Sequence, residues 1–200
     1  MFSTVVRLAA VTALFSLGLV ACTANPPPAG SGGGGGTSGP AQAQVSATSV
    51  DFGPVGCGEA PWSAHLQALR PGIRYAGFDP SDYAVEQFGA SRNVRQGSFG
   101  GLGELGIRER FDLLICADVL HYLDEEEIRR GLPVAARLIR GAAFFEVMTA
   151  EDDVIGDTLG LRRRPAQWYR DLFTAAGLTQ VGPYLWIGDD LRARASPLEL

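Results

Sequence analysis

From residue 46 onward, short apolar runs alternate with amphipathic stretches, and this alternation restricts the fold more than any other feature of the sequence. Residues 111–116 are almost continuously apolar, which is typical of a central strand covered on both faces. Repeated alternation of strand and helix predicts an α/β fold, a parallel sheet with helices on both faces. The predicted strands are residues 50–55, 74–78, 93–96, 111–116 and 142–147, and the predicted helices are residues 59–69, 81–88, 124–139 and 165–177.

Local signals mark several boundaries of these elements. Ser81 is a suitable N-cap for its helix, and the acidic run at residues 124–127 favours a helix N-terminus. Pro133 predicts a kink or a break, because proline removes one helical hydrogen bond. Two short β runs within residues 178–187 flank Gly182 and predict an antiparallel pair.

The charge balance and the residue types exclude several classes of function. The 200 residues carry 22 acidic and 17 basic side chains, a net charge of −5, which argues against a nucleic-acid partner. Every basic residue is an arginine, so chemistry that depends on a lysine amine is excluded. Two histidines are too few for a His-rich metal site, and three scattered cysteines fit neither a zinc site nor a disulfide scaffold. We therefore expect no metal.

Parallel sheets bind ligands beyond the carboxyl ends of their strands, so the residues after each strand are candidate site residues. Gly56 and Gly58 form a glycine-rich turn that would let a ligand approach the backbone closely; a purely structural turn is the alternative. Asp79 lies 21 residues after Gly58, the separation at which a carboxylate reaches ribose hydroxyls in dinucleotide folds; an ordinary turn aspartate is the alternative. We expect this carboxylate to be exposed when no ligand is bound.

The later strand ends carry weaker signals. Ser98 and Phe99 follow the third strand, near where an adenine would lie, or they belong to a simple loop. His121 follows the fourth strand and is either a catalytic base or, as is commoner for a single histidine at a helix start, a structural residue.

Three blocks, residues 55–60, 75–81 and 111–123, together resemble the class I S-adenosylmethionine-dependent methyltransferases. The resemblance covers about residues 55–190 in the right order, and the third block distinguishes this family from nicotinamide enzymes. It implies a Rossmann-like fold, S-adenosylmethionine as the cofactor, and transfer of its methyl group to a substrate nucleophile.

The resemblance also implies roles for individual residues. Gly56 and Gly58 would line the methionine portion of the cofactor, and Asp79 would hold the ribose. The other cofactor contacts would come from Ser98 and Phe99 beside the adenine, and from Ala117 and Asp118 beside the methionine and sulfonium. Contact with the substrate would come from His121, Glu146 or Tyr83.

Two features depart from the family's pattern. Pro54 stands two residues before the first glycine, where the family usually has an acidic residue, and it removes a backbone N–H from a central strand. A Gly- and Ser-rich segment stands where the family usually has helices that cover the substrate. Residues 46–56 instead resemble the opening strand of immunoglobulin-like modules in bacterial surface lipoproteins. The resemblance therefore leaves open whether the fold is complete on its N-terminal side, and it predicts a weak or open cofactor site.

Residues 1–21 have the pattern of a secretory signal, with one basic residue, an apolar run and small residues before Cys22. The run is shorter than the roughly 20 apolar residues that span a bilayer. Residues 19–22 resemble the lipobox of bacterial lipoproteins, which implies cleavage before Cys22 and lipid attachment to it; a chance cysteine is the alternative. Residues 22–45 are rich in Pro, Gly and Ser and predict a disordered tether.

These observations predict a methyltransferase-like domain at residues 46–190 and a tail at residues 191–200. The expected function is methyl transfer from S-adenosylmethionine to a small-molecule acceptor. The alternative is a non-catalytic, lipid-anchored envelope protein whose Rossmann-like body binds a ligand or a partner. The leader predicts a location in the cell envelope, with membrane contact only through Cys22. A misassigned start or a fusion would instead place the chain in the cytoplasm.

Overall fold

The computed structural model describes residues 50–69, 72–154 and 158–195, which belong to one compact unit. The predicted signal peptide, the lipidation of Cys22 and the tether lie outside these residues. The strands are β1 Asp51–Pro54, β2 Arg74–Tyr75, β3 Gly77–Asp79, β4 Val94–Gln96, β5 Phe111–Ala117, β6 Ile139–Glu146, β7 Thr179–Gln180 and β8 Leu185–Ile187. The helices are α2 Pro61–Leu69, α3 Asp82–Arg92, α4 Glu125–Leu138, α5 Ala166–Ala175 and α6 Asp189–Arg192, with a 3-10 turn at Leu102–Glu104.

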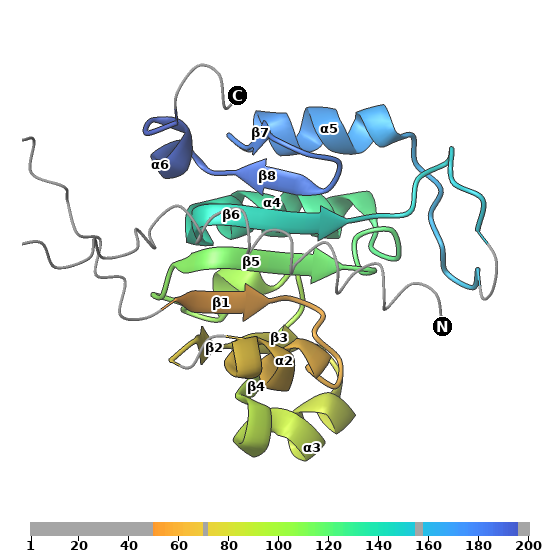
Figure 1. The fold of residues 1–200 in the computed structure, drawn as a ribbon. Helices are drawn as coiled ribbons and strands as arrows, with labels where there is room; N and C mark the ends of the chain where they lie inside the picture. Colours follow the sequence, from red (N-terminus) through yellow and green to blue (C-terminus); the bar gives the residue numbers. More distant parts are fainter. Residues whose placement is uncertain (1–49, 70–71, 155–157, 196–200) are drawn as a thin grey trace, which may run out of the picture. The chain divides into compact units, whose positions relative to one another are not determined.

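Six strands form one sheet in the order β2-β1-β5-β6-β8-β7, and β3 and β4 form a two-stranded sheet. An isolated bridge between Val55 and Phe78 joins the end of β1 to β3, and Gly56 and Cys57 also donate to the Phe78 carbonyl. The pairs among β1, β2, β5 and β6 are parallel, whereas β8 is antiparallel to β6 and to β7. Figure 1 shows β1, β5 and β6 pointing the same way, so their carboxyl ends meet at one edge. This confirms the predicted α/β fold with its mostly parallel sheet, and also the antiparallel pair within residues 178–187.

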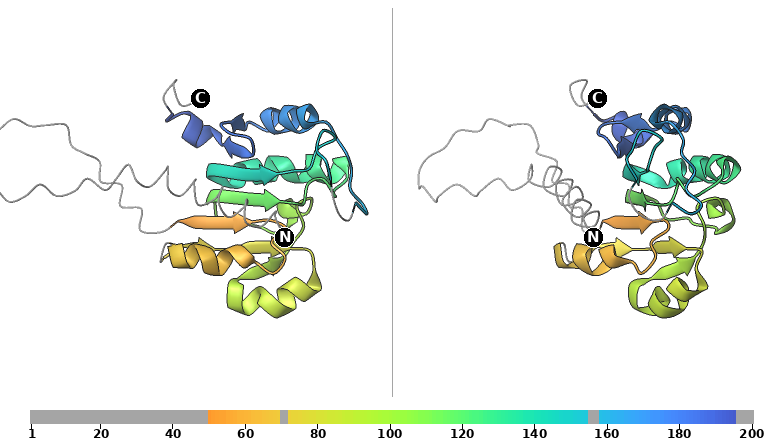
Figure 2. Two further views of the ribbon diagram at one scale, coloured as in Figure 1. Left: turned by 45° about the vertical axis from the view of Figure 1, so that its right-hand side comes forward. Right: turned by 90° about the vertical axis from the view of Figure 1, so that its right-hand side faces the viewer.

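Helices cover both faces of the sheet. Figure 2 shows α4 and α5 on one face and α2 on the other. α4 buries Ile128, Leu132 and Leu138, and α5 buries Tyr169 and Phe173. Full burial of such side chains contributes about 1.5–3 kcal/mol each, so this face carries much of the stability. Within the described ranges, no helix combines the length and the apolar character that crossing a membrane requires.

Pro54 is the last residue of β1, and it pairs on one side with Ile115 of β5, which continues to Ala117. On the other side, Phe52 accepts a hydrogen bond from Ala76, and Gly56 donates one to Phe78. In a parallel pair, every second residue of a strand bonds to the same neighbouring strand. Pro54 therefore faces the same neighbour as Phe52 and Gly56, and its missing N–H leaves one hydrogen bond unmade opposite Ala76. The interruption coincides with the end of β2 and the start of β3. The proline is therefore accommodated by a division of the neighbouring strand.

α4 is fixed at its start and continues to Leu138. The Asp124 side chain accepts from the Glu127 N–H at 2.8 Å, and Glu127 accepts from the Asp124 N–H at 3.2 Å, which is a capping box. Of the two effects predicted for Pro133, the break is wrong, because the helix runs through this residue. Pro133 is exposed while its neighbours Leu132 and Ala135 are buried, so packing on the sheet outweighs the lost hydrogen bond.

Four charged side chains from four adjacent strands form a network at the amino edge of the sheet. Arg74 on β2 donates to Asp51 on β1 at 2.6 Å. Arg140 on β6 donates to Asp112 on β5 at 2.7 Å and to Asp51 at 3.2 Å. The Asp51 N–H also donates to the Asp112 carboxylate at 2.9 Å. These contacts hold the strand order at the edge opposite the predicted site.

Candidate functional site

Asp79, at the end of β3, contacts the glycine turn, the start of α3 and the end of β4. Its Oδ2 accepts from the Gly58 N–H at 2.7 Å, and its Oδ1 accepts from the Ser81 N–H at 2.9 Å. Its carbonyl oxygen accepts from the Gly97 N–H at 3.0 Å, which brings the end of β4 alongside. The expectation that the carboxylate is exposed is wrong, because Asp79 is only 7% exposed. The glycine turn and the start of α3 close over it.

The two glycines of the turn are required for different reasons. Gly56 has a φ of +70°, and a Cβ there would lie 2.2 Å from Val119 Cγ2, so this position is closed by the loop after β5. Gly58 has a φ of +49°, and a Cβ there would meet nothing within 4 Å. Gly58 therefore faces open space while its N–H holds Asp79, which suits a position where a ligand approaches the backbone.

The structure places Ser98 and Phe99 differently. Ser98 is half-buried, and its Oγ accepts from the Gly101 N–H at 3.1 Å. Phe99 is 2% exposed and packs in the core, where a Cβ on Gly131 of α4 would lie 2.7 Å from its ring. Its ring is therefore part of the core, and its carbonyl oxygen also lies against Gly131, so Phe99 offers almost no surface to a ligand.

Ala117 and Asp118 lie at the carboxyl end of β5 and are half-buried. Asp118 has a φ of +59°, and its N–H donates to the Glu146 carbonyl at 3.2 Å, so the ends of β5 and β6 are joined. A side chain in this left-handed region costs about 1–2 kcal/mol, and such strained residues cluster at functional sites.

The three candidates for substrate contact occupy different surroundings. His121 is completely buried, and its Nδ1 accepts from the Met148 N–H at 3.0 Å, so it joins the loops after β5 and β6. Glu146 is half-buried at the end of β6, beside Asp118. Tyr83 is 62% exposed on α3 and stacks edge-on against Phe88 of the same helix. The geometry brings Glu146 to the carboxyl edge and gives His121 a structural contact.

Sequence reasoning missed the environment of Cys57, which lies between the two glycines. Burial, followed by the nearby Asp79 carboxylate, raises the pKa of the Cys57 thiol to about 12. The thiol is therefore neutral at physiological pH and is unsuited to nucleophilic attack. Only the position of Cys57 in the turn was visible in the sequence.

Sequence reasoning also missed the arginine that secures the loops at this edge. Arg164 donates to the carbonyls of Leu123 and Leu120, at 2.7 and 3.4 Å, and to the Tyr169 hydroxyl at 3.2 Å. The neighbouring Arg163 donates to the carbonyls of Ala150 and Asp152, at 2.7 and 2.8 Å. The run of three arginines at residues 162–164 was the available signal, but it does not show which carbonyls each of them reaches.

Comparisons with known proteins bear on the domain and its fold. Residues 54–144 match a family model described as a methyltransferase domain. Similar solved structures include an O-methyltransferase family protein from Burkholderia thailandensis, with 19% identity, coverage of 70% of this chain and 50% of that one, and a TM-score of 0.52. The described domain has the class I methyltransferase fold.

Two further solved structures share this fold. TnmH is 24% identical, with coverage of 69% of this chain and 48% of that one and a TM-score of 0.51. PigF with SAH is 18% identical, with coverage of 69% and 49% and a TM-score of 0.54. The chain thus spans about half the length of these neighbours. No curated protein matches the sequence.

The residues at the carboxyl edge fit S-adenosylmethionine, which the methyltransferase-domain match and the neighbour solved with SAH support as the cofactor. The open space above Gly58 leaves room beside the turn. The Asp79 carboxylate has about four acceptor positions, of which the Gly58 and Ser81 N–H groups occupy two. The remaining two can accept from hydroxyl groups.

Proposed function

We propose that this chain transfers a methyl group from S-adenosylmethionine to a small-molecule acceptor. The observation that carries the proposal is the hydrogen bond from the Gly58 N–H to the Asp79 carboxylate, which joins the glycine turn to the end of β3 inside the matched range 54–144. The small-molecule class is supported by the net charge of −5, which disfavours nucleic acid, and by the likeness to an O-methyltransferase family protein.

In this proposal the chain binds and aligns the reactants. Bound S-adenosylmethionine supplies a methyl group on a positively charged sulfur, which is a good leaving group. Asp79 accepts from the ribose hydroxyls, and the Gly58 backbone lies against the methionine portion. Asp118 and Glu146, whose backbones are hydrogen-bonded, border the place where the acceptor approaches. Alignment alone supplies much of the acceleration of such a displacement.

Calorimetry with S-adenosylmethionine and S-adenosylhomocysteine tests cofactor binding, and two glycine variants locate it. Gly58 and Gly106 both have a positive φ, and a Cβ at either meets nothing within 4 Å. Gly106 lies in the segment before β5, away from the carboxyl edge. We expect Gly58→Ala to weaken binding at least tenfold and Gly106→Ala to leave it unchanged, although both acquire similar backbone strain. Equal affinities in the two variants would place the cofactor elsewhere.

Transfer is tested separately, by incubation with S-adenosylmethionine labelled in its methyl group and pools of small-molecule acceptors. Label in a product supports the enzyme. Cofactor binding without label in any pool would favour the alternative, a protein that binds a ligand or a partner without catalysis. The methyltransferase-domain match does not favour that alternative.

We also propose that the chain is exported and lipid-anchored at Cys22. The support is the sequence of residues 1–22, where a basic start, an apolar run and a lipobox-like end occur together. S-adenosylmethionine is made and used in the cytoplasm, so methyl transfer would then belong to uncleaved or internally started chains.

A further inference from the structure

A cavity lies beside the ends of β6 and β8, under the first turns of α5. Its volume is about 260 Å³, and its lining residues fall between Phe145 and Trp186. This range lies outside residues 54–144, which match the methyltransferase domain. Pockets for drug-sized ligands measure roughly 300–1,000 Å³, so this one fits a single ring with short substituents.

The floor of the cavity is aromatic and rigid. Phe173 contacts the rings of Phe145 and Trp186, with centroids 5.1 and 5.0 Å apart, and the ring of Tyr169 at 6.1 Å. All four residues are at most 2% exposed. These four rings therefore pack mainly on one another, and the exposed aromatic surface at the cavity belongs to Tyr184, which is 39% exposed. An exposed aromatic ring favours a flat ring over an aliphatic chain.

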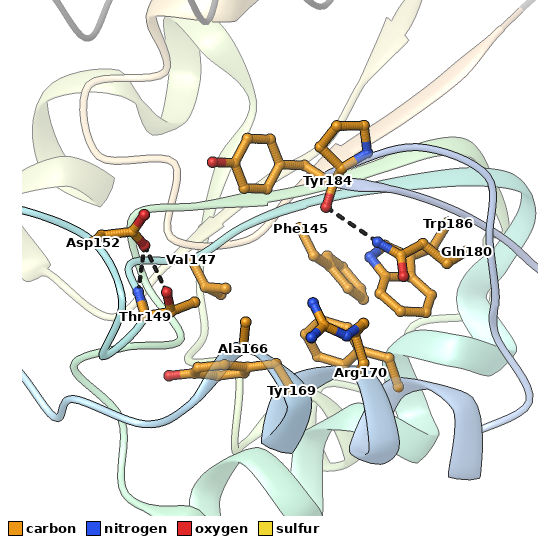
Figure 3. Close-up of a pocket in the computed structure, with 12 residues that line it drawn as sticks. Phe145, Val147, Thr149, Asp152, Ala166, Tyr169, Arg170, Gln180, Tyr184 and Trp186 are labelled. Atoms are coloured by element: carbon orange, nitrogen blue, oxygen red, sulfur yellow. Dashed lines mark hydrogen bonds between the residues drawn. The ribbon is translucent and has the colours of Figure 1, made fainter.

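Arg170 supplies a positive charge at the wall formed by α5. Figure 3 shows its guanidinium directed into the space between the lining side chains. In the described part of the chain, its one hydrogen bond runs from Nε to Gln167 at 3.1 Å. The N–H groups of the two terminal nitrogens are therefore available to a ligand. Together they match the two oxygens of a carboxylate.

Asp152 supplies a negative charge from the loop after β6, on the other side of the cavity (Figure 3). Its Oδ2 accepts from both the N–H and the Oγ1 of Thr149, at 2.7 and 2.8 Å, which fixes the side chain. Among the described residues no donor reaches Oδ1, so this oxygen can accept from a ligand. Burial and the carboxylates of Asp152 and Glu146 raise the pKa of Tyr184, so its hydroxyl stays neutral beside this carboxylate.

We propose that this cavity binds a small zwitterion in which one aromatic ring separates a carboxylate, held by Arg170, from an ammonium group, held by Asp152. Both side chains are exposed, so a molecule with only one charge would form one of the two ion pairs and leave the other residue in water. The site is distinct from the cofactor residues, so binding requires neither S-adenosylmethionine nor methyl transfer.

Calorimetry with three probes and the full chain, without cofactor, tests the charge pattern. The probes are 4-(aminomethyl)benzoate, which carries both charges, benzoate and benzylamine. We expect 4-(aminomethyl)benzoate to bind at least tenfold more tightly than either of the others. Equal affinities for the three probes, or no binding of 4-(aminomethyl)benzoate at millimolar concentration, would overturn the proposal.

Two variants assign the charges to their residues. Arg170→Gln should weaken binding of 4-(aminomethyl)benzoate and of benzoate about ten- to a hundredfold and leave benzylamine unchanged. Asp152→Asn should weaken 4-(aminomethyl)benzoate and benzylamine and leave benzoate unchanged. The matched controls are Arg129→Gln and Asp171→Asn, exposed residues that do not line the cavity.

Loss of all three probes in Arg170→Gln, or the same loss in Arg129→Gln, would contradict the assignment. Asp152→Asn could lower the melting temperature by disturbing the contact with Thr149. In that case the Arg170 variant still tests whether Arg170 binds the carboxylate of the ligand. Unchanged binding of S-adenosylhomocysteine in Arg170→Gln separates this site from the proposed methyltransferase site.

Discussion

The carboxylate of Asp79 joins two segments of backbone before any ligand binds. Each of its oxygens accepts one N–H, from the glycine turn and from the start of α3, and the residue is 7% exposed. The sequence spacing located this residue, but burial could not be read from it, because burial depends on how the turn folds over the strand end. A substitution here therefore affects the fold as well as the ligand.

Asp79→Asn should lower the free energy of unfolding by about 1–3 kcal/mol, because an amide replaces one acceptor with a donor that faces a backbone N–H. It should also weaken binding of S-adenosylhomocysteine. Urea denaturation and calorimetry measure the two effects. Asp82→Asn, in the exposed first turn of α3, is the control and should change stability by less than about 0.5 kcal/mol. Equal stabilities of the two variants would show that the Asp79 hydrogen bonds are weak.

At the scale of elements, the sequence predicted those whose signals are local. The apolar run of β5 and the acidic start of α4 are examples. The sequence predicted that the helix ends at residue 139 and that the next strand begins at residue 142. In the structure α4 ends at Leu138 and β6 begins directly afterwards, at Ile139. Ile139 is extended because it pairs with Phe111, which is 28 residues earlier in the chain. Such a pairing has no local signal.

Pro133→Ala should raise the free energy of unfolding by about 1–3 kcal/mol, because the helix regains a hydrogen bond and loses the clash of the proline ring. Chemical denaturation measures the change. Pro165→Ala is the matched control, since Pro165 occupies the N-cap position of α5, where no helical hydrogen bond is lost. An unchanged or lower stability for Pro133→Ala would mean that α4 has adapted to its proline.

The charge network at the amino edge predicts how stability depends on acid. Burial alone would raise the pKa of Asp112, but hydrogen bonds and charge from Arg140, with the Asp51 N–H, lower it overall. A lowered carboxylate pKa stabilises the fold above the unfolded value, about 3.9, and this stabilisation is lost as pH falls through the folded pKa. Asp112→Asn should therefore flatten the fall in stability below about pH 4, measured by urea denaturation at several pH values. Arg140→Gln should flatten it too, and an unchanged slope in both variants would contradict this role.

At the scale of the whole molecule, the position of the site followed from the strand–helix alternation, because the carboxyl ends of parallel strands meet at one edge. The aromatic cavity under α5 did not follow from it. Its residues Phe145, Phe173 and Trp186 look like ordinary core positions in the sequence. Only their convergence with Arg170 and Asp152 from separate segments makes a cavity, and convergence is a property of the folded chain.

Export is tested on the whole chain. We expect the expressed protein in the membrane fraction, with its N-terminus at a lipid-modified Cys22, and we expect Cys22→Ala to abolish lipid labelling. Fractionation followed by mass spectrometry of the N-terminus measures both. An intact, unmodified Met1 in the soluble fraction would reject export and favour a cytoplasmic enzyme.

The division of the neighbouring strand opposite Pro54 has a consequence for the rates at which amide protons exchange with solvent. β3 and β4 form their own sheet, which is joined to the end of β1 by the Val55–Phe78 bridge and by hydrogen bonds from the glycine turn, whereas β5 is paired with both β1 and β6. A unit with a shorter strand ladder opens at a lower free energy than the central strands. Amides of β4 and α3 should therefore exchange faster than those of β5 and β6. Because Asp79 lies at the end of β3, S-adenosylhomocysteine should slow exchange most in this outer unit, so that ligand binding also closes the sheet.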